Sequence, residues 1–148
     1  MPNKQYTPDE WLPRATAYCA QAERCAADVR LKLRQWGCAD AAQSDSIIDR
    51  LYDESFLDDD RYCRAFVHDK VAYQGWGRVK IRMMLLMKHL PEREADAALR
   101  CLDPALYREA LRRAVGRYGA TDRDRTIRFC LQRGFTYEEI LQELSYSS

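Results

Sequence analysis

Apolar residues recur at helical spacing along almost the whole chain. In one stretch, the apolar residues Cys25, Val29, Leu33 and Trp36 lie three or four positions apart, and arginines lie between them. Because residues three and four apart share one face of a helix, this pattern predicts an amphipathic helix that ends at Gly37. No stretch alternates apolar and polar residues as a half-buried strand does. The sequence therefore predicts an all-α fold.

The same reasoning predicts nine helices in all. The segment Thr7-Pro8-Asp9-Glu10 is typical of a capping box with proline in the first helical position. Proline inside a helix removes a backbone hydrogen bond, so we expect Pro13 to separate a short turn from the first main helix. The nine predicted helices cover approximately residues 12–23, 25–36, 41–54, 58–74, 78–89, 91–102, 104–118, 127–133 and 137–144.

Two of these helices carry unusually many large apolar residues. In the fourth, Tyr62, Ala65, Phe66 and Tyr73 are expected on one apolar face. The helix at 78–89 is apolar over most of its circumference, which predicts a central and largely buried position. Its apolar residues include Val79, Ile81, Met83, Leu85 and Leu86.

The predicted helices group in threes. Val29, Ile81 and Ile127 begin equivalent middle helices, 52 and 46 residues apart, and each is followed four residues later by a leucine, at Leu33, Leu85 and Leu131. A recurrence near 50 residues is typical of stacked helical repeats. We predict an N-terminal extension with a short turn at 1–11 and three tandem three-helix repeats at 12–57, 58–102 and 103–148.

Charge is distributed unevenly along the 148 residues, although the net charge is only +1. Residues 61–133 contain 17 Lys or Arg and 8 Asp or Glu, a net charge of +9. The preceding residues carry a net −5 and the following ones a net −3. A basic middle segment predicts a polyanion or an acidic protein surface as partner. Ordinary solvated helix faces explain the same composition equally well.

Several features bear on cellular location. The longest apolar run, Met83 to Met87, falls far short of the about 20 residues that span a bilayer, and the N-terminus has no apolar signal-peptide core. The six cysteines include no C-x-x-C pair that would suggest structural zinc. We expect a cytoplasmic protein without membrane contact, whose thiols are reduced.

The segment Asp58-Asp59-Asp60 raises the question of a metal site, and Gly75-Trp76-Gly77 that of a phosphate loop. Consecutive aspartates point in different directions, whereas one aspartate at a helix start caps free N–H groups, so we interpret Asp58 as an N-cap. The glycines follow a helix rather than a strand, which favours a helix-to-helix turn. His68 and His89 belong to no catalytic constellation. We therefore expect no enzyme activity, metal or cofactor.

The sequence also resembles a known family. The segment FLDDDRYCRAFV at 56–67, followed by Gly75-Trp76-Gly77 and Ile81-x-x-x-Leu85, resembles the central signature of the RecX regulatory proteins. DVRLKLRQWG at 28–37 and RGFTYEEI at 133–140 resemble the family's first and third units. Three places depart from its pattern, at Cys25, Arg78 and Leu90-Pro91, and these affect caps and turns.

The resemblance implies an elongated, curved array of three-helix repeats of the right-handed helical type, without catalysis or cofactor. It implies binding to the RecA recombinase in the helical groove of its nucleoprotein filament, with inhibition of its ATPase, strand-exchange and SOS coprotease activities. Such a protein modulates DNA repair and recombination, and we expect a monomer. The alternative is a helical protein that binds single-stranded or double-stranded DNA directly through its basic segment.

Two sets of residues follow from these observations. The candidate filament-binding or partner-binding residues are basic and lie on adjacent predicted elements: Arg61, Arg64, Lys70, Arg78, Lys80, Arg82, Arg112 and Arg113. The residues expected to carry the structural motif are Leu57, Asp58, Asp59, Tyr62, Phe66, Gly75, Trp76, Gly77, Ile81, Leu85, Gly134 and Phe135.

Overall fold

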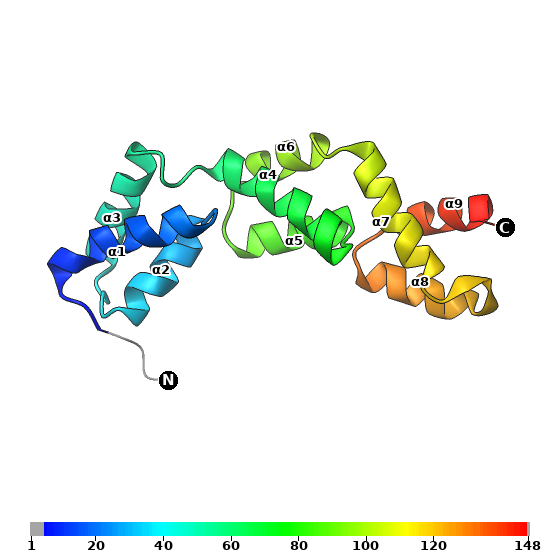
Figure 1. The fold of residues 1–148 in the computed structure, drawn as a ribbon, viewed down its shortest axis with the longest axis horizontal. Coiled ribbons are helices and arrows are strands. Elements are labelled where there is room, and N and C mark those ends of the chain that lie inside the picture. Colours follow the sequence, from blue (N-terminus) through cyan, green and yellow to red (C-terminus); the bar gives the residue numbers. More distant parts are fainter. Residues whose placement is uncertain (1–4, 148) are drawn as a thin grey trace. The chain divides into compact units, whose positions relative to one another are not determined.

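The computed structural model describes residues 5–147, and over this range it contains nine α-helices, one π-helix, one 3₁₀-helix and no strand (Figure 1). The all-α prediction is confirmed. Residues 1–4 of the predicted extension and the last residue of the third predicted repeat lie outside the described residues. The elements are α1 (Pro8–Gln21), α2 (Ala26–Gln35), α3 (Ala41–Asp53), α4 (Asp59–Asp69), the π-helix η1 (Lys70–Gln74), α5 (Arg78–Met87), α6 (Glu92–Arg100), α7 (Pro104–Gly116), the 3₁₀-helix η2 (Gly119–Thr121), α8 (Arg123–Gln132) and α9 (Tyr137–Ser147).

The chain divides into two compact units between Tyr62 and Cys63, within α4. Unit 1 holds α1, α2, α3 and the first turn of α4. Unit 2 holds the rest of α4 and all later elements, so it contains the predicted third repeat and the predicted second repeat except residues 58–62. The exact repeat boundaries remain a prediction.

The core of unit 1 is formed by the apolar faces of α1, α2 and α3 and by the segments that follow α2 and α3. The Trp36 carbonyl, at the end of α2, accepts hydrogen bonds from the Trp11 indole N–H (3.3 Å) and from the Tyr6 backbone N–H (2.9 Å). These two bonds attach the N-terminal segment and α1 to the end of α2. The buried core residues are Trp11, Ala15, Val29, Leu33, Cys38, Ile48, Leu51 and Leu57.

The predicted break at Pro13 is wrong, because α1 runs continuously from Pro8 to Gln21 with Pro13 inside it. The predicted capping box is present, and the Thr7 backbone N–H donates to the Glu10 carboxylate at 3.2 Å. Proline at this position removes the bond to the carbonyl four residues earlier, at Asp9 in the exposed first turn. Such a carbonyl can bond to water instead, so the helix continues.

The middle helices of the three predicted repeats end with the same backbone geometry, which α3 also shares through Ser55 (φ 63°) and the Phe56 N–H, a donor to the Leu51 carbonyl at 2.8 Å. After α2, α5 and α8, a residue with positive φ follows the helix: Gly37 (103°), His89 (65°) and Gly134 (101°). In each case the next residue donates its N–H to the carbonyl five positions earlier, at 2.8, 3.1 and 3.2 Å respectively. This is the Schellman arrangement, which satisfies carbonyls left free at a helix end.

The shared helix ends correct the predicted register of the third repeat. Counted back from Gly134, the equivalents of the buried Val29 and Leu33 are Thr126 and Cys130, and both are fully buried. The predicted equivalents Ile127 and Leu131 are therefore one residue out of register, and Leu131 is 45% exposed. The helix also begins earlier than predicted, at Arg123, because the Asp122 carboxylate accepts the Arg125 backbone N–H at 3.0 Å.

Two expectations about burial in unit 2 are also wrong. Only one stripe of α5 is buried, formed by Ile81 and Leu85, while Val79, Met83 and Met87 on another face are at least half exposed. Tyr73, predicted on the apolar face of the fourth helix, is 77% exposed. It lies in η1, whose wider turn rotates it away from the direction that a 3.6-residue period predicts.

Candidate anion-binding cleft and basic residues

The aspartate cluster begins α4. The Asp58 carboxylate accepts the backbone N–H of Arg61 at 2.9 Å, which confirms the predicted N-cap. Asp59 accepts a hydrogen bond from the Tyr52 hydroxyl at 2.7 Å, and burial, together with this bond, raises the pKa of Tyr52. No group of three His, Cys, Asp or Glu side chains within the described residues is arranged to hold a metal ion.

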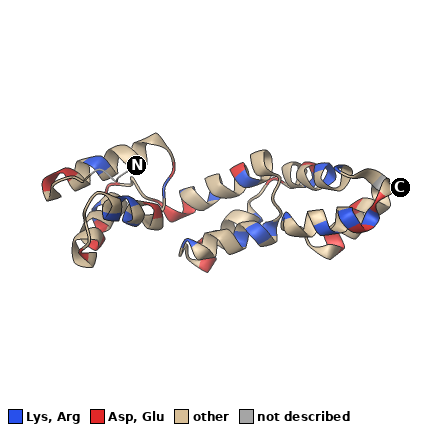
Figure 2. Ribbon diagram, turned by 90° about the horizontal axis from the view of Figure 1, so that it is seen from below, with Lys and Arg blue, Asp and Glu red and all other residues tan. Residues whose placement is uncertain are grey.

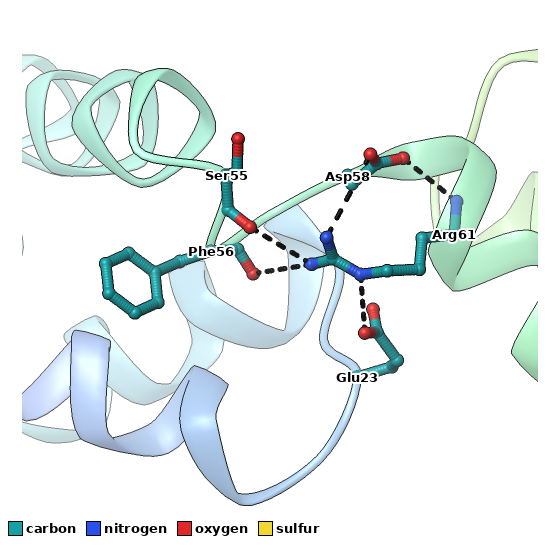
Figure 3. Close-up of polar contacts among 5 residues, drawn as sticks. All are labelled: Glu23, Ser55, Phe56, Asp58 and Arg61. Atoms are coloured by element: carbon teal, nitrogen blue, oxygen red, sulfur yellow. Dashed lines mark hydrogen bonds and ion pairs between the residues drawn. The ribbon is translucent and has the colours of Figure 1, made fainter.

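Arg61, the first predicted partner-binding residue, makes contacts within unit 1 (Figure 3). Its Nε lies 2.6 Å from the Glu23 carboxylate, and its Nη2 donates to the carbonyls of Ser55 (3.2 Å) and Phe56 (3.3 Å). The second Glu23 oxygen is buried and has no hydrogen-bond partner among residues 5–147. Arg61 therefore links the start of α4 to the segments that follow α1 and α3, and its role toward a partner stays a prediction.

The Gly75-Trp76-Gly77 segment forms the predicted turn and also joins two predicted repeats. Gly75 ends η1 with φ 68°, and Gly77 caps α5. The Gly77 backbone N–H donates to the carbonyl of Arg133 at 2.7 Å, and the Val79 N–H donates to that of Gly134 at 3.1 Å. A Cβ atom on Gly77 would overlap the carbonyl group of Gly134. Glycine at both positions lets the two turns approach this closely.

Arg78 extends this junction. Its guanidinium lies 3.9 Å from the centre of the Tyr107 ring, and its Nη1 lies 3.5 Å from the Glu139 carboxylate. The Tyr107 hydroxyl accepts the Arg78 backbone N–H at 3.1 Å and donates to Glu139 at 3.2 Å. Arg78 thus connects the start of α5 to α7 and α9.

Three further candidate arginines pair with carboxylates close by. Arg82 on α5 contacts Asp96 at 2.8 Å and Glu92 at 3.1 Å, both on α6, and the hydrogen bond from Arg82 lowers the pKa of Asp96. Arg112 and Arg113 both contact Glu109 on the same helix, Arg113 at 3.2 Å, and the bond from Arg112 lowers the pKa of Glu109.

The two candidate lysines meet at Trp76. The ammonium nitrogen of Lys80 lies 4.2 Å from the centre of the half-buried Trp76 ring, and that of Lys70 lies 4.8 Å from it. Such contacts hold a cation over an aromatic face without neutralising its charge. Arg64 is exposed on α4. Figure 2 shows basic residues on helices of both units, interspersed with acidic ones.

A cleft in unit 2 brings together basic residues that the sequence pattern did not group. It has a volume of about 260 Å³ and lies where η1 packs against α7, with α8 beside them. Its lining includes three arginines and no aspartate or glutamate. The cleft, called the arginine cleft below, is lined by Val71, Ala72, Tyr73, Gln74, Gly75, Ala110, Arg113, Ala114, Arg117, Phe129 and Arg133.

The three arginines are positioned by different contacts. The Arg133 Nη1 donates to the Gln74 carbonyl at 2.9 Å, which ties α8 to the end of η1. The guanidiniums of Arg133 and Arg117 lie 5.0 and 5.9 Å from the centre of the Phe129 ring. Among the predicted partner-binding residues, only Arg113 lines this cleft. In the sequence, Arg117 and Arg133 stand out only as members of the basic segment. The sequence did not indicate a cleft between them, because the π-helix η1, which forms part of the cleft, was not predicted.

No helix in the described part of the chain combines the length and apolar character needed to cross a membrane. The fold and these sites can now be compared with known proteins. Residues 58–99 match a family profile described as the second three-helix domain of RecX. This segment contains the aspartate cap, the glycine turn and the buried stripe of α5.

Curated relatives extend the match to most of the chain. A protein from Leptothrix cholodnii named regulatory protein RecX is 33% identical over 136 residues, which covers 88% of this chain and 85% of that protein. A protein of the same name from Pseudomonas fluorescens is 32% identical over 132 residues, which covers 85% of this chain and 84% of that protein.

Solved structures agree at the level of the fold. The crystal structure of RecX from Lactobacillus salivarius superposes with a TM-score of 0.78 at 20% identity and covers 94% of this chain and 95% of that chain. A further crystal structure, of regulatory protein RecX, has a TM-score of 0.80 at 19% identity and covers 93% of this chain and 73% of that chain. Because the sequence relationship reaches 33% identity over 88% of its length, this chain belongs to the RecX family of regulatory proteins.

Proposed function

We propose that this protein binds a RecA-type recombinase filament and restrains its ATPase, strand-exchange and coprotease activities. The observation that carries the proposal is the family relationship over 88% of the chain, since this covers residues of both compact units. A regulator that acts by binding needs accessible surface and no catalytic constellation. The exposed basic residues of unit 2 provide surface for contacts with carboxylates or phosphates of a filament.

The test is an ATPase assay with a RecA recombinase assembled on single-stranded DNA. We expect added protein to lower the rate of ATP hydrolysis and to co-sediment with the filament. A protein without catalytic activity acts by occupancy, so the inhibition should saturate with concentration. Unchanged hydrolysis together with no co-sedimentation at excess protein would rule out this function.

Direct binding to nucleic acid is a second candidate function, favoured by the net charge of +9 over residues 61–133. Binding that rests on phosphate contacts weakens steeply with salt because counterions are released. High affinity for bare DNA at physiological salt, with no preference for the filament, would favour this second function. Weak affinity for bare DNA and strong affinity for the filament would favour the first.

A further inference from the structure

The arginine cleft contains positive charge that its own lining does not neutralise. Arg117 and Arg133 have no ion pair with a carboxylate among the described residues, and the partner of Arg113, Glu109, lies outside the lining. Guanidinium groups bind carboxylates and phosphates through paired N–H donors. The ligand of the cleft is therefore expected to be an anion.

The floor of the cleft is apolar, which restricts the kind of anion. Val71, Ala110 and Ala114 are buried, and Phe129 is half-buried beside them. A bare phosphate or a hydrated ion gains nothing from such a floor, whereas an apolar side chain entering it is removed from water. The volume of about 260 Å³ is sufficient for one such side chain.

The aromatic residues of the cleft do not form a platform for nucleic-acid bases. Bases bind single-strand sites by stacking on free aromatic faces. The Phe129 ring already has Tyr118 against it in a T-shaped contact at 5.3 Å, in addition to the guanidiniums of Arg117 and Arg133. Tyr73, the other aromatic residue of the lining, is exposed, and a single ring gives little for a strand to stack on.

We propose that the arginine cleft binds a short acidic segment of a partner protein, with one apolar side chain on the floor and flanking carboxylates on Arg113, Arg117 and Arg133. Taking this segment to belong to the recombinase rests on the function proposed above. The walls are pre-organised, since Arg133 holds the end of η1 through the Gln74 carbonyl. Binding therefore orders the peptide more than the protein.

A direct test uses the full chain and a fluorescent peptide of sequence GDEFEDG, read by fluorescence anisotropy. We expect saturable binding that weakens as NaCl is raised, because the contacts are between charges at a solvent-accessible site. The neutral peptide GNQFQNG should not bind, and GDESEDG, which lacks the apolar side chain, should bind more weakly. Equal affinity for all three peptides would overturn the proposal.

The matched variants change the same charge at two places in unit 2. Arg113→Glu with Arg117→Glu reverses two charges in the cleft, and the affinity for GDEFEDG should fall by at least about tenfold. Arg93→Glu with Arg100→Glu reverses two exposed charges on α6, outside the cleft lining, and should have little effect. Circular dichroism checks that both variants stay folded. An equal loss in both pairs would mean non-specific attraction and would contradict the assignment.

A third variant should act in the opposite direction. Glu109 pairs with Arg113 at 3.2 Å, and it competes with an incoming carboxylate. Glu109→Gln removes this competitor, so the affinity for GDEFEDG should rise by up to about fivefold. If Arg113 and Arg117 had only a structural role, Glu109→Gln would not strengthen peptide binding. A lower affinity of this variant for GDEFEDG would contradict the proposal that the cleft binds the peptide.

The recombinase assay separates this inference from the proposed function. If the wild-type chain does not bind or inhibit the filament, the proposed function fails whatever the peptide does. If it inhibits, and Arg113→Glu with Arg117→Glu inhibits equally well, the function stands and the cleft is not its contact. A ten-nucleotide oligothymidylate is the alternative probe. If it binds and loses affinity in the Arg113→Glu, Arg117→Glu variant, while GDEFEDG does not bind, the cleft binds nucleic acid and the peptide proposal is wrong.

Discussion

Arg61, Arg78 and Arg82 lie in one basic stretch of sequence, and each is held by carboxylates or carbonyls of its own unit. Guanidinium groups have several donors in a fixed geometry, so a single arginine can connect two or three segments of backbone. At the scale of single residues, basic composition therefore overstates the charge available to a partner. Lys70 and Lys80, which rest on Trp76, are better candidates for outward contacts.

The first prediction concerns Arg61. Arg61→Ala removes the contacts with Glu23, Ser55 and Phe56, and we expect the free energy of unfolding to fall by about 1–2 kcal/mol, because the side chain is still 43% exposed and water screens part of the ion pair. Urea denaturation measures this. Arg34→Ala, on the exposed face of α2, should change the value by less than about 0.5 kcal/mol. Equal effects of the two variants would contradict the role given to Arg61.

The second prediction concerns His89. Its φ of 65° is one that glycine adopts at no steric cost, so His89→Gly should raise the free energy of unfolding by about 1 kcal/mol. His68 is exposed within α4 and has ordinary helical geometry, so His68→Gly should lower it by a similar amount. Thermal denaturation of both variants gives the two signs. A lower stability for His89→Gly would show that the side chain makes a favourable contact that outweighs the backbone strain.

At the scale of elements, the end of α8 meets the start of α5 through backbone atoms. Two backbone hydrogen bonds and two glycines form this contact, and Arg133 and Arg78 add side-chain contacts on its edges. Such a close backbone contact requires that no Cβ atom lies between the two segments, and it otherwise depends little on side-chain identity. This is why glycine is needed at both Gly77 and Gly134.

The third prediction tests this contact. Gly77→Ala places a Cβ against the carbonyl group of Gly134, and we expect a loss of about 1–3 kcal/mol in the free energy of unfolding. Gly116→Ala is the control, because it lies in α7 with open space around it, and it should stabilise the protein by about 0.5–1 kcal/mol. A neutral Gly77→Ala would mean that the two turns separate without cost.

At the scale of the whole molecule, the chain divides into two units between Tyr62 and Cys63. We therefore expect a destabilising substitution inside one unit to lower the local stability mainly of that unit. Local stability follows the contacts that an element makes, and these lie largely within each unit.

The fourth prediction follows from this division. Gly134→Ala should lower the hydrogen-exchange protection of helices in unit 2 while leaving α1, α2 and α3 unchanged, since a Cβ there overlaps Lys80 within unit 2. Arg61→Ala should lower protection mainly in unit 1. Mass spectrometry of peptic fragments measures both. A uniform loss of protection in either variant would show that the two units unfold as one.

The helical content, most helix ends, the Asp58 cap and the family could all be inferred from local patterns, because each rests on local spacing, turn chemistry or a contiguous motif. Which apolar residues are buried became clear only from the folded chain. Ile127 and Leu131 have the right spacing, yet Thr126 and Cys130 face the core, since burial depends on which neighbour covers a helix. The tertiary structure also decided that Gly77 meets Gly134 and that Arg117 and Arg133 share a cleft with Arg113. These residues are far apart in sequence, and packing, which no local pattern encodes, brings them together.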